Sequence, residues 1–152
     1  MSTQGANLQV DVMAFLMPQD HARLLRKGET IPASLEAGFE QLGKLDPDWI
    51  WVLESDREIK GVLLACPCHG AAFVWRIAIA PDLDNVAVLR LLRRFLSDLK
   101  KRGVKGYLTI VDPKVATQTR LMELIQKGGG TEVGQYSLMV GPVEGGVSLC
   151  RG

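Results

Sequence analysis

Cys66, Cys68 and His69 stand close together and are the first group in the sequence with metal-binding side chains. Their spacing is C-x-C-H, whereas structural zinc sites usually have four ligands and a C-x-x-C pair. Among the other cysteines and histidines, Cys150 and His21 are the ones left to complete such a set. We therefore expect a hairpin turn with free thiols and no bound metal.

Arg76 is a charged residue inside an apolar segment, 72–80, that alternates as a strand does. Val74, Ala78 and Ala80 have the same parity and are small, so that face has room for an open cleft beside the guanidinium. This room suits an anion or an acceptor substrate, and the alternative is an arginine that reaches solvent or an ion pair. The opposite parity holds the larger side chains, namely Phe73, Trp75, Ile77 and Ile79.

For the remaining candidate residues, a structural role is the simpler interpretation. His21 and His69 lack a serine–acid partner and are expected at the surface. Glu54 ends a predicted strand, where a solvated carboxylate is common. Tryptophans can line a binding groove, but strands favour aromatic residues and core packing is the expected role. The three tryptophans are Trp49, Trp51 and Trp75.

One predicted helix concentrates basic residues on its outer side, at Arg90, Arg93, Arg94, Lys100, Lys101 and Arg102. Such a face can bind nucleic acid, but Asp98 interrupts it and charged outer helix faces are common. The net charge of +1 adds no general attraction to nucleic acid or anionic membranes. We expect no nucleic acid partner.

The composition describes one ordinary domain. The 152 residues are 47% hydrophobic and 23% charged, which is enough to bury a core. No apolar run is long enough to cross a membrane, and the first ten residues do not resemble a secretion signal. Three cysteines, an odd number, favour a reduced, cytoplasmic location. We expect a single domain over 8–140 with flexible tails, 1–7 and 141–152.

Apolar periodicity, glycines and prolines divide the chain into ten elements. The predicted order is β-α-α-β-β-β-α-β-α-β, in an α/β (α+β) arrangement with a mixed sheet and helices on both faces. The long helix should connect two parallel strands. The predicted strands are 8–17, 49–53, 59–65, 72–80, 106–111 and 131–140, and the predicted helices are 20–27, 34–42, 85–102 and 116–127.

This order resembles the GNAT superfamily of N-acyltransferases, which move an acyl group from coenzyme A to an amine. The resemblance spans about 8–140 and rests on two stretches, Ile77-Ala-Ile-Ala-Pro81 before the long helix and Gly129-Gly-Thr-Glu-Val-Gly134 after the last one. It implies a GNAT-like fold and an acetyl-CoA or other acyl-CoA cofactor. The implied cofactor-binding residues are Ile77, Ala78, Ile79, Asn85, Val86, Ala87 and Val88.

The family's glycine-rich phosphate loop is altered here. Asp84 stands at its arginine position, and Asn85, Ala87 and Leu89 stand at its glycine positions. Backbone N–H groups at a helix start bind phosphate, and a carboxylate beside them repels it. With Asp82 close by, we expect acetyl-CoA to bind weakly or not at all.

The family's tyrosine that protonates the leaving thiolate corresponds to Ile125, and its upstream asparagine corresponds to Gln118. Tyr107 and Tyr136 lie elsewhere in the sequence. The catalytic candidates that remain are Glu54, Arg76 and Tyr136, with Glu54 where some GNAT proteins hold a water-linked base.

Two functions stay open. The first is a divergent N-acyltransferase in which an unknown amine attacks the thioester directly, while strand amides near Ile77 to Ile79 polarise its carbonyl. The second is a GNAT-fold binding or structural protein, such as a virus-associated assembly protein, that has lost coenzyme A chemistry. Its partner would be another protein, and an oligomer fits either function.

Overall fold

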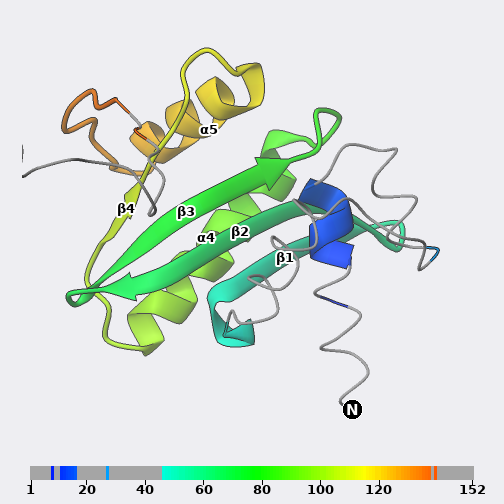
Figure 1. Ribbon diagram of the computed structural model, residues 1–152, viewed down its shortest axis with the longest axis horizontal. Helices are drawn as coiled ribbons and strands as arrows, with labels where there is room; N and C mark the ends of the chain where they lie inside the picture. Colours follow the sequence, from blue (N-terminus) through cyan, green and yellow to red (C-terminus); the bar gives the residue numbers. More distant parts are fainter. Residues whose placement is uncertain (1–7, 9–10, 17–26, 28–45, 138, 140–152) are drawn as a thin grey trace, which may run out of the picture.

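The computed structural model describes Leu8, residues 11–16, Lys27, residues 46–137 and Met139. Between residues 46 and 137 the chain forms a four-stranded sheet, two α-helices and one short 3-10 helix (Figure 1). Within the described residues, no helix has both the length and the hydropathy to span a membrane. The elements are η1 (Pro47–Trp49), β1 (Ile50–Ser55), β2 (Glu58–Cys68), β3 (Ala71–Ile79), α4 (Asn85–Lys101), β4 (Tyr107–Thr109) and α5 (Ala116–Lys127).

The sheet has the order β1-β2-β3-β4. The first three strands form an antiparallel meander, and β4 pairs in parallel with β3. Both hairpins turn through residues with positive φ, Asp56 (54°) and Arg57 (65°) in one and His69 (48°) and Gly70 (83°) in the other. Turns of this kind match the twist of the strands that they join. The predicted meander and the predicted parallel crossover through the long helix are confirmed.

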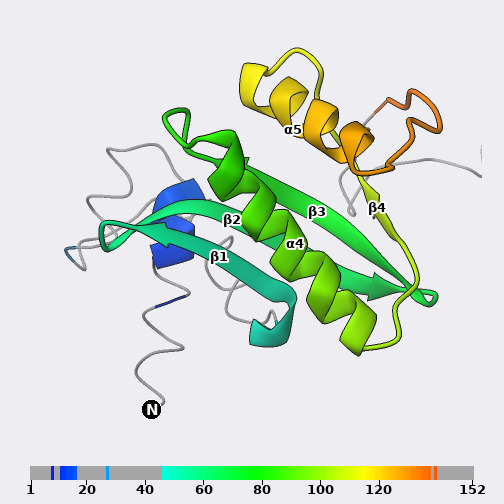
Figure 2. The ribbon, with the colours of Figure 1, turned by 180° about the vertical axis from the view of Figure 1, so that it is seen from behind.

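Helix α4 covers one face of the sheet (Figure 2). Its buried residues follow the helical period and pack on Leu63, Ala65, Val74 and other strand side chains. An aromatic row runs through this core, with Phe95 between Trp51 (centroids 4.9 Å apart) and Tyr107 (5.6 Å). These edge-on contacts join β1, α4 and β4 in one packed layer.

A helical segment, 11–16, lies on the opposite face of the sheet (Figure 1). Val12 is fully buried there against Val62 and Leu64. The predicted strand 8–17 is therefore wrong for the residues that are described. Leu8, Val12 and Leu16 recur at i, i+4 and i+8, and this helical spacing buries one side against the sheet.

Helix α5 has the predicted bounds, whereas the segment after it does not form the predicted strand 131–140. Residues 131–137 have no regular secondary structure, and Val133 (77% exposed) and Tyr136 (85%) lie at the surface. A segment with alternating apolar residues forms a strand only where it can pair with the edge of another strand and pack its apolar side against a core. The predicted helices 20–27 and 34–42 lie outside the described residues, apart from Lys27, and the domain bounds 8–140 stay a prediction.

Candidate functional site

A β-bulge at Trp75 divides β3 into two halves. Leu64 pairs with Arg76 and Ala65 pairs with Val74, so Trp75 is an extra residue opposite β2. The extra residue reverses the alternation of side chains. Ala72 and Val74 therefore share the α4 face with Ile77 and Ile79, which corrects the predicted grouping of Phe73 and Trp75 with those isoleucines. Trp75 is 42% exposed.

The bulge coincides with the point where β3 and β4 separate. Their pairing covers Ala72 to Val74 and stops at Thr109, whose hydroxyl donates to the Val74 carbonyl (3.3 Å). Beyond it β4 turns away towards α5 (Figures 1 and 2). We call the place where the two strands separate, just beyond the Val74–Thr109 pair, the fork.

The strand edge beyond the fork carries backbone groups that face away from β2. The Ala80 N–H donates to the Lys60 carbonyl (2.8 Å), which marks a hydrogen-bonded pair of the β2–β3 ladder. Because such pairs alternate in an antiparallel ladder, Ile77 and Ile79 direct their N–H and C=O groups to the other edge. An extended ligand that carries amide groups can bind there as an added strand.

Helix α5 already reaches this edge through one side chain. The Gln118 amide donates to the Ile77 carbonyl (2.9 Å) in a partly buried contact. Gln118 corresponds to the asparagine of the family pattern, and its longer side chain spans from α5 to β3. The Ile77 carbonyl is therefore engaged, while the structure shows no bond from the Ile77 N–H to β4.

Asp84 is the N-cap of α4. Its carboxylate accepts from the Ala87 N–H (2.8 Å), and its carbonyl accepts from the Val88 N–H (3.2 Å). Side-chain caps of this kind stabilise the first turn. The N–H groups of Asn85 and Val86, at the same helix start, have no hydrogen-bond acceptor among the described residues. Asp84 therefore caps the helix well, and it makes this loop a poorer phosphate site than the family's glycine-rich loop.

Two cations lie near this loop. Lys60 forms an ion pair with Asp82 (3.4 Å), which raises the pKa of Lys60. Arg120 of α5 donates from Nε to the Asn85 side-chain oxygen. Sequence reasoning missed Arg120, because nothing in its local pattern indicates a contact with a residue 35 positions away.

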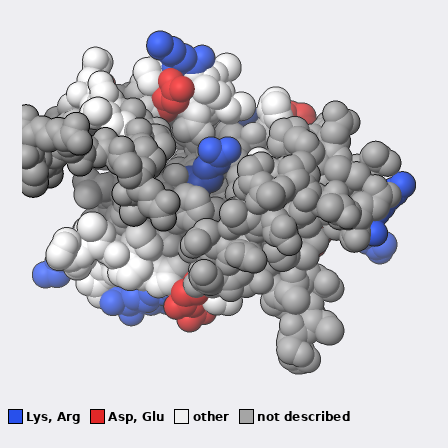
Figure 3. Space-filling model, in the orientation of Figure 1, with Lys and Arg blue, Asp and Glu red and all other residues white. Residues whose placement is uncertain are grey.

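The three catalytic candidates do not converge. Arg76 is exposed and lies beside Leu64 on the face opposite α4, where Figure 3 shows basic atoms over β3. Glu54 is exposed at the far end of β1, opposite Ile59. Tyr136 is exposed in the segment after α5. Among them, Arg76 is the residue next to the fork.

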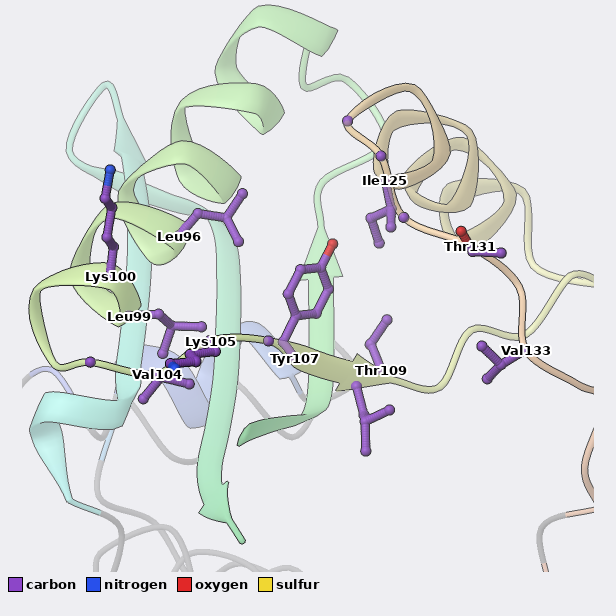
Figure 4. Close-up of a pocket in the computed structure, with 16 residues that line it drawn as sticks. Leu96, Leu99, Lys100, Val104, Lys105, Tyr107, Thr109, Ile125, Thr131 and Val133 are labelled. Atoms are coloured by element: carbon purple, nitrogen blue, oxygen red, sulfur yellow. The ribbon is translucent and has the colours of Figure 1, made fainter. Parts of the chain in front are cut away.

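A cavity of about 830 Å³ lies between the end of α4, β4 and residues 128–133. Its lining includes Tyr107, Thr109 and Ile125 but none of the predicted cofactor-binding residues. Tyr107 directs its hydroxyl towards Ile125 (Figure 4). Burial raises the pKa of Tyr107, so its phenol keeps its proton at neutral pH.

The other candidates have structural roles in the described residues. Arg102 stacks over Trp49 (5.1 Å) and Trp51 (5.3 Å), so these two tryptophans pack in the fold as expected. Cys66 and Cys68 are half-buried free thiols on β2. Across the described residues, no group of three or more His, Cys, Asp or Glu side chains is placed to hold a metal.

Comparison with solved structures shows which fold this is. An aminoglycoside acetyltransferase from an uncultured soil metagenomic sample, in complex with sisomicin, is 12% identical (TM-score 0.53), over 90% of this chain and 89% of that one. The aminoglycoside N-acetyltransferase AAC(6′)-Iy in complex with CoA is 16% identical (TM-score 0.53), over 83% and 96%. A transcriptional regulator from Bacillus halodurans is 19% identical (TM-score 0.53), over 77% and 83%.

The chain therefore has the fold of the GNAT acyltransferases, as the sequence predicted. No family model matches the sequence, and no curated protein matches it. At these identities the likeness shows the fold alone.

Proposed function

We propose that the protein is an N-acyltransferase that binds an acyl-CoA at the fork and transfers the acyl group to an amine. The observation that carries this proposal is the strand edge of Ile77 and Ile79 beyond the bulge, which within the described residues is not paired with β4 and has Gln118 as its side-chain partner. An acyl-CoA supplies a thioester at the end of an extended arm with amide groups, and such an arm suits a strand edge. The likeness to acetyltransferases of the same fold supports the proposal.

The chain's own groups then have defined roles. The Ile77 N–H polarises the thioester carbonyl, the amine nitrogen forms a bond to the carbonyl carbon, and the C–S bond breaks. The amine releases a proton to solvent, and the thiolate takes one. That proton comes from solvent, because Tyr107 packs against Phe95 beneath the paired half of β3 and Tyr136 is exposed after α5.

Arg76 is the residue that we assign to the acceptor. It is exposed on the face opposite α4, one residue away from Ile77. A guanidinium favours an acceptor that carries a carboxylate or another anionic group. Arg76→Gln should then raise the KM for such an acceptor and change kcat less.

A titration with acetyl-CoA, followed by amide NMR, tests the function. The Ile77 and Ile79 amide signals should shift with acetyl-CoA concentration. The amide of Val52 on β1, a strand that does not pair with β3, should not shift and acts as the internal control. The absence of shifts at saturating acetyl-CoA would contradict the proposal.

The second candidate is a GNAT-fold binding or structural protein without coenzyme A chemistry. The observation that favours it is the Asp84 cap, which places a carboxylate at the start of α4 and engages the Ala87 N–H. This candidate predicts no acetyl-CoA binding by the native chain and none after Asp84→Asn. The same titration therefore separates the two functions.

A further inference from the structure

We propose that Arg120 of α5 binds the phosphates of the acyl donor, in place of the loop arginine whose position Asp84 occupies. The inference rests on the proposed function, and it names the residue that would make the acyl-CoA site selective for a donor with phosphates. The contact between Arg120 and Asn85 brings a cation from α5 to the start of α4. No other Lys or Arg side chain in the described residues forms a hydrogen bond or an ion pair with Asn85, Val86 or Ala87.

The geometry leaves the binding face of Arg120 available. Asn85 accepts from Nε, and within residues 46–137 neither terminal nitrogen of Arg120 has a hydrogen bond or an ion pair. Terminal guanidinium nitrogens form paired hydrogen bonds with phosphate oxygens. Asn85 therefore orients the side chain without neutralising its charge.

Electrostatics gives an independent reason to expect an anion. The first turn of a helix carries partial positive charge, so a cation there is unfavourable. Arg120 is held at this end of α4 by a neutral amide, and Asp84 directs its carboxylate to the Ala87 N–H. A phosphate bound between Arg120 and the N–H groups of Asn85 and Val86 would balance this charge.

Two side chains of α5 contact the two parts of the candidate site. Gln118 contacts Ile77 at the strand edge, and Arg120 contacts Asn85 at the helix start. An acyl donor whose thioester arm lies along Ile77 and whose phosphates reach Asn85 would occupy both parts of the candidate site. In this proposal the cation that binds phosphate comes from α5, whereas the family pattern has it in the loop before α4.

Calorimetric titration with two probes tests the assignment. CoA carries the phosphates, and acetyl-pantetheine has the same arm without them. Arg120→Gln should weaken CoA binding about 10- to 100-fold, because a charge-assisted contact is lost, and should leave acetyl-pantetheine binding unchanged. Arg120→Lys should keep part of the CoA affinity. Arg93→Gln is the matched control, since Arg93 is exposed on α4 and has no contact in the described residues.

The outcomes separate this inference from the function on which it rests. If CoA affinity is the same in the native chain and in Arg120→Gln, the assignment of Arg120 is wrong and the acyl-CoA site stands. If the native chain binds CoA no better than acetyl-pantetheine, the assignment is also wrong. If neither probe binds, the proposed function fails, and the inference fails with it. A loss of CoA affinity in Arg120→Gln but not in Arg93→Gln, with acetyl-pantetheine unaffected, supports it.

Discussion

From Ala72 to Val74, β3 is hydrogen-bonded to a strand on each side, whereas from Ile77 to Ile79 it is bonded to β2 on one side. The first half is also held by packing, since Phe95 joins Trp51 and Tyr107 beneath it. The second half meets α5 through a single polar contact, from Gln118. Both halves of the strand bury side chains in the core, but only the second half leaves backbone groups unpaired by β4, and we propose that this edge binds the ligand.

This difference separates residues that hold the fold from those that we propose bind the ligand. Buried apolar contacts are lost only at a high cost in stability. A hydrogen bond to a strand edge can be exchanged for one to a ligand at little net cost. Substitutions in the paired half should therefore change stability, and those around the fork should change binding.

Phe95→Ala should have the largest effect. Phe95 is 1% exposed and contacts aromatic rings from two strands, so its removal should lower the free energy of unfolding by about 3–5 kcal/mol. Chemical denaturation measures this change. Phe95→Leu, which keeps most of the volume, should cost less and supplies a folded variant. Its acetyl-CoA affinity should equal that of the native chain, and a marked change would show that the halves are not independent.

Asp84→Asn should change binding without changing stability. Asparagine caps a helix as well as aspartate does, so the melting temperature should stay the same. Removing the negative charge should raise CoA affinity by about tenfold at low salt and by less at physiological salt. Calorimetry at two salt concentrations measures it. Asp82→Asn is the control with a smaller expected effect, because Lys60 already pairs with Asp82.

Gln118→Ala should act on both properties in opposite directions. The Ile77 carbonyl loses its partner, so the free energy of unfolding should fall by about 1 kcal/mol. The same carbonyl becomes free for an amide of the ligand, so acetyl-CoA affinity should rise several-fold. Gln126→Ala, at an exposed position of the same helix, should do neither. Weaker binding by Gln118→Ala would mean that Gln118 contacts the ligand itself.

The smallest expected effect is the pH dependence of stability that comes from Asp98. This residue lies on α4 and contacts Trp51, in the packed layer beneath the paired half of β3. The indole N–H of Trp51 donates to Asp98 (2.9 Å), and this bond, with Arg94 nearby, lowers the pKa of the carboxyl group. Its stabilising contribution is therefore complete above the unfolded-state pKa of about 4 and is lost as the pH falls through the lower, folded-state value.

Asp98→Asn keeps an acceptor for Trp51 but cannot titrate. Its unfolding free energy should fall less steeply than that of the native chain as the solution is acidified below about pH 4. Urea denaturation across that range measures the difference. Parallel curves for the two proteins would contradict this account of Asp98.

Much of the fold could be predicted because its elements carry local signals. The meander follows from alternating apolar residues between turn residues, and α4 follows from its apolar stripe and from Gly103 at its end. The segment at 11–16 was assigned to the wrong class, since a short apolar run fits a strand or a helix and its partners, Val62 and Leu64, are distant in sequence.

The site was less predictable than the fold. Ile77 and Ile79 could be named from a family pattern, but the bulge at Trp75 depends on the register between two strands, which no local pattern encodes. The contacts of Gln118 and Arg120 depend on where α5 docks. Sequence reasoning therefore marked the departure at Asp84 without finding that Arg120 lies beside the start of α4.

The shortness of β4 has a consequence for the order in which the protein opens. The meander and α4 are joined by long ladders and a shared core, whereas β4 is joined to β3 by three residue pairs. Segments with few backbone bonds to the rest of a fold open at a lower free energy than its core strands. Backbone amides of Tyr107 to Thr109 should then exchange with deuterium sooner than those of Val62 to Leu64. Ligand entry at the fork would in that case need only the departure of β4, while the meander keeps its structure.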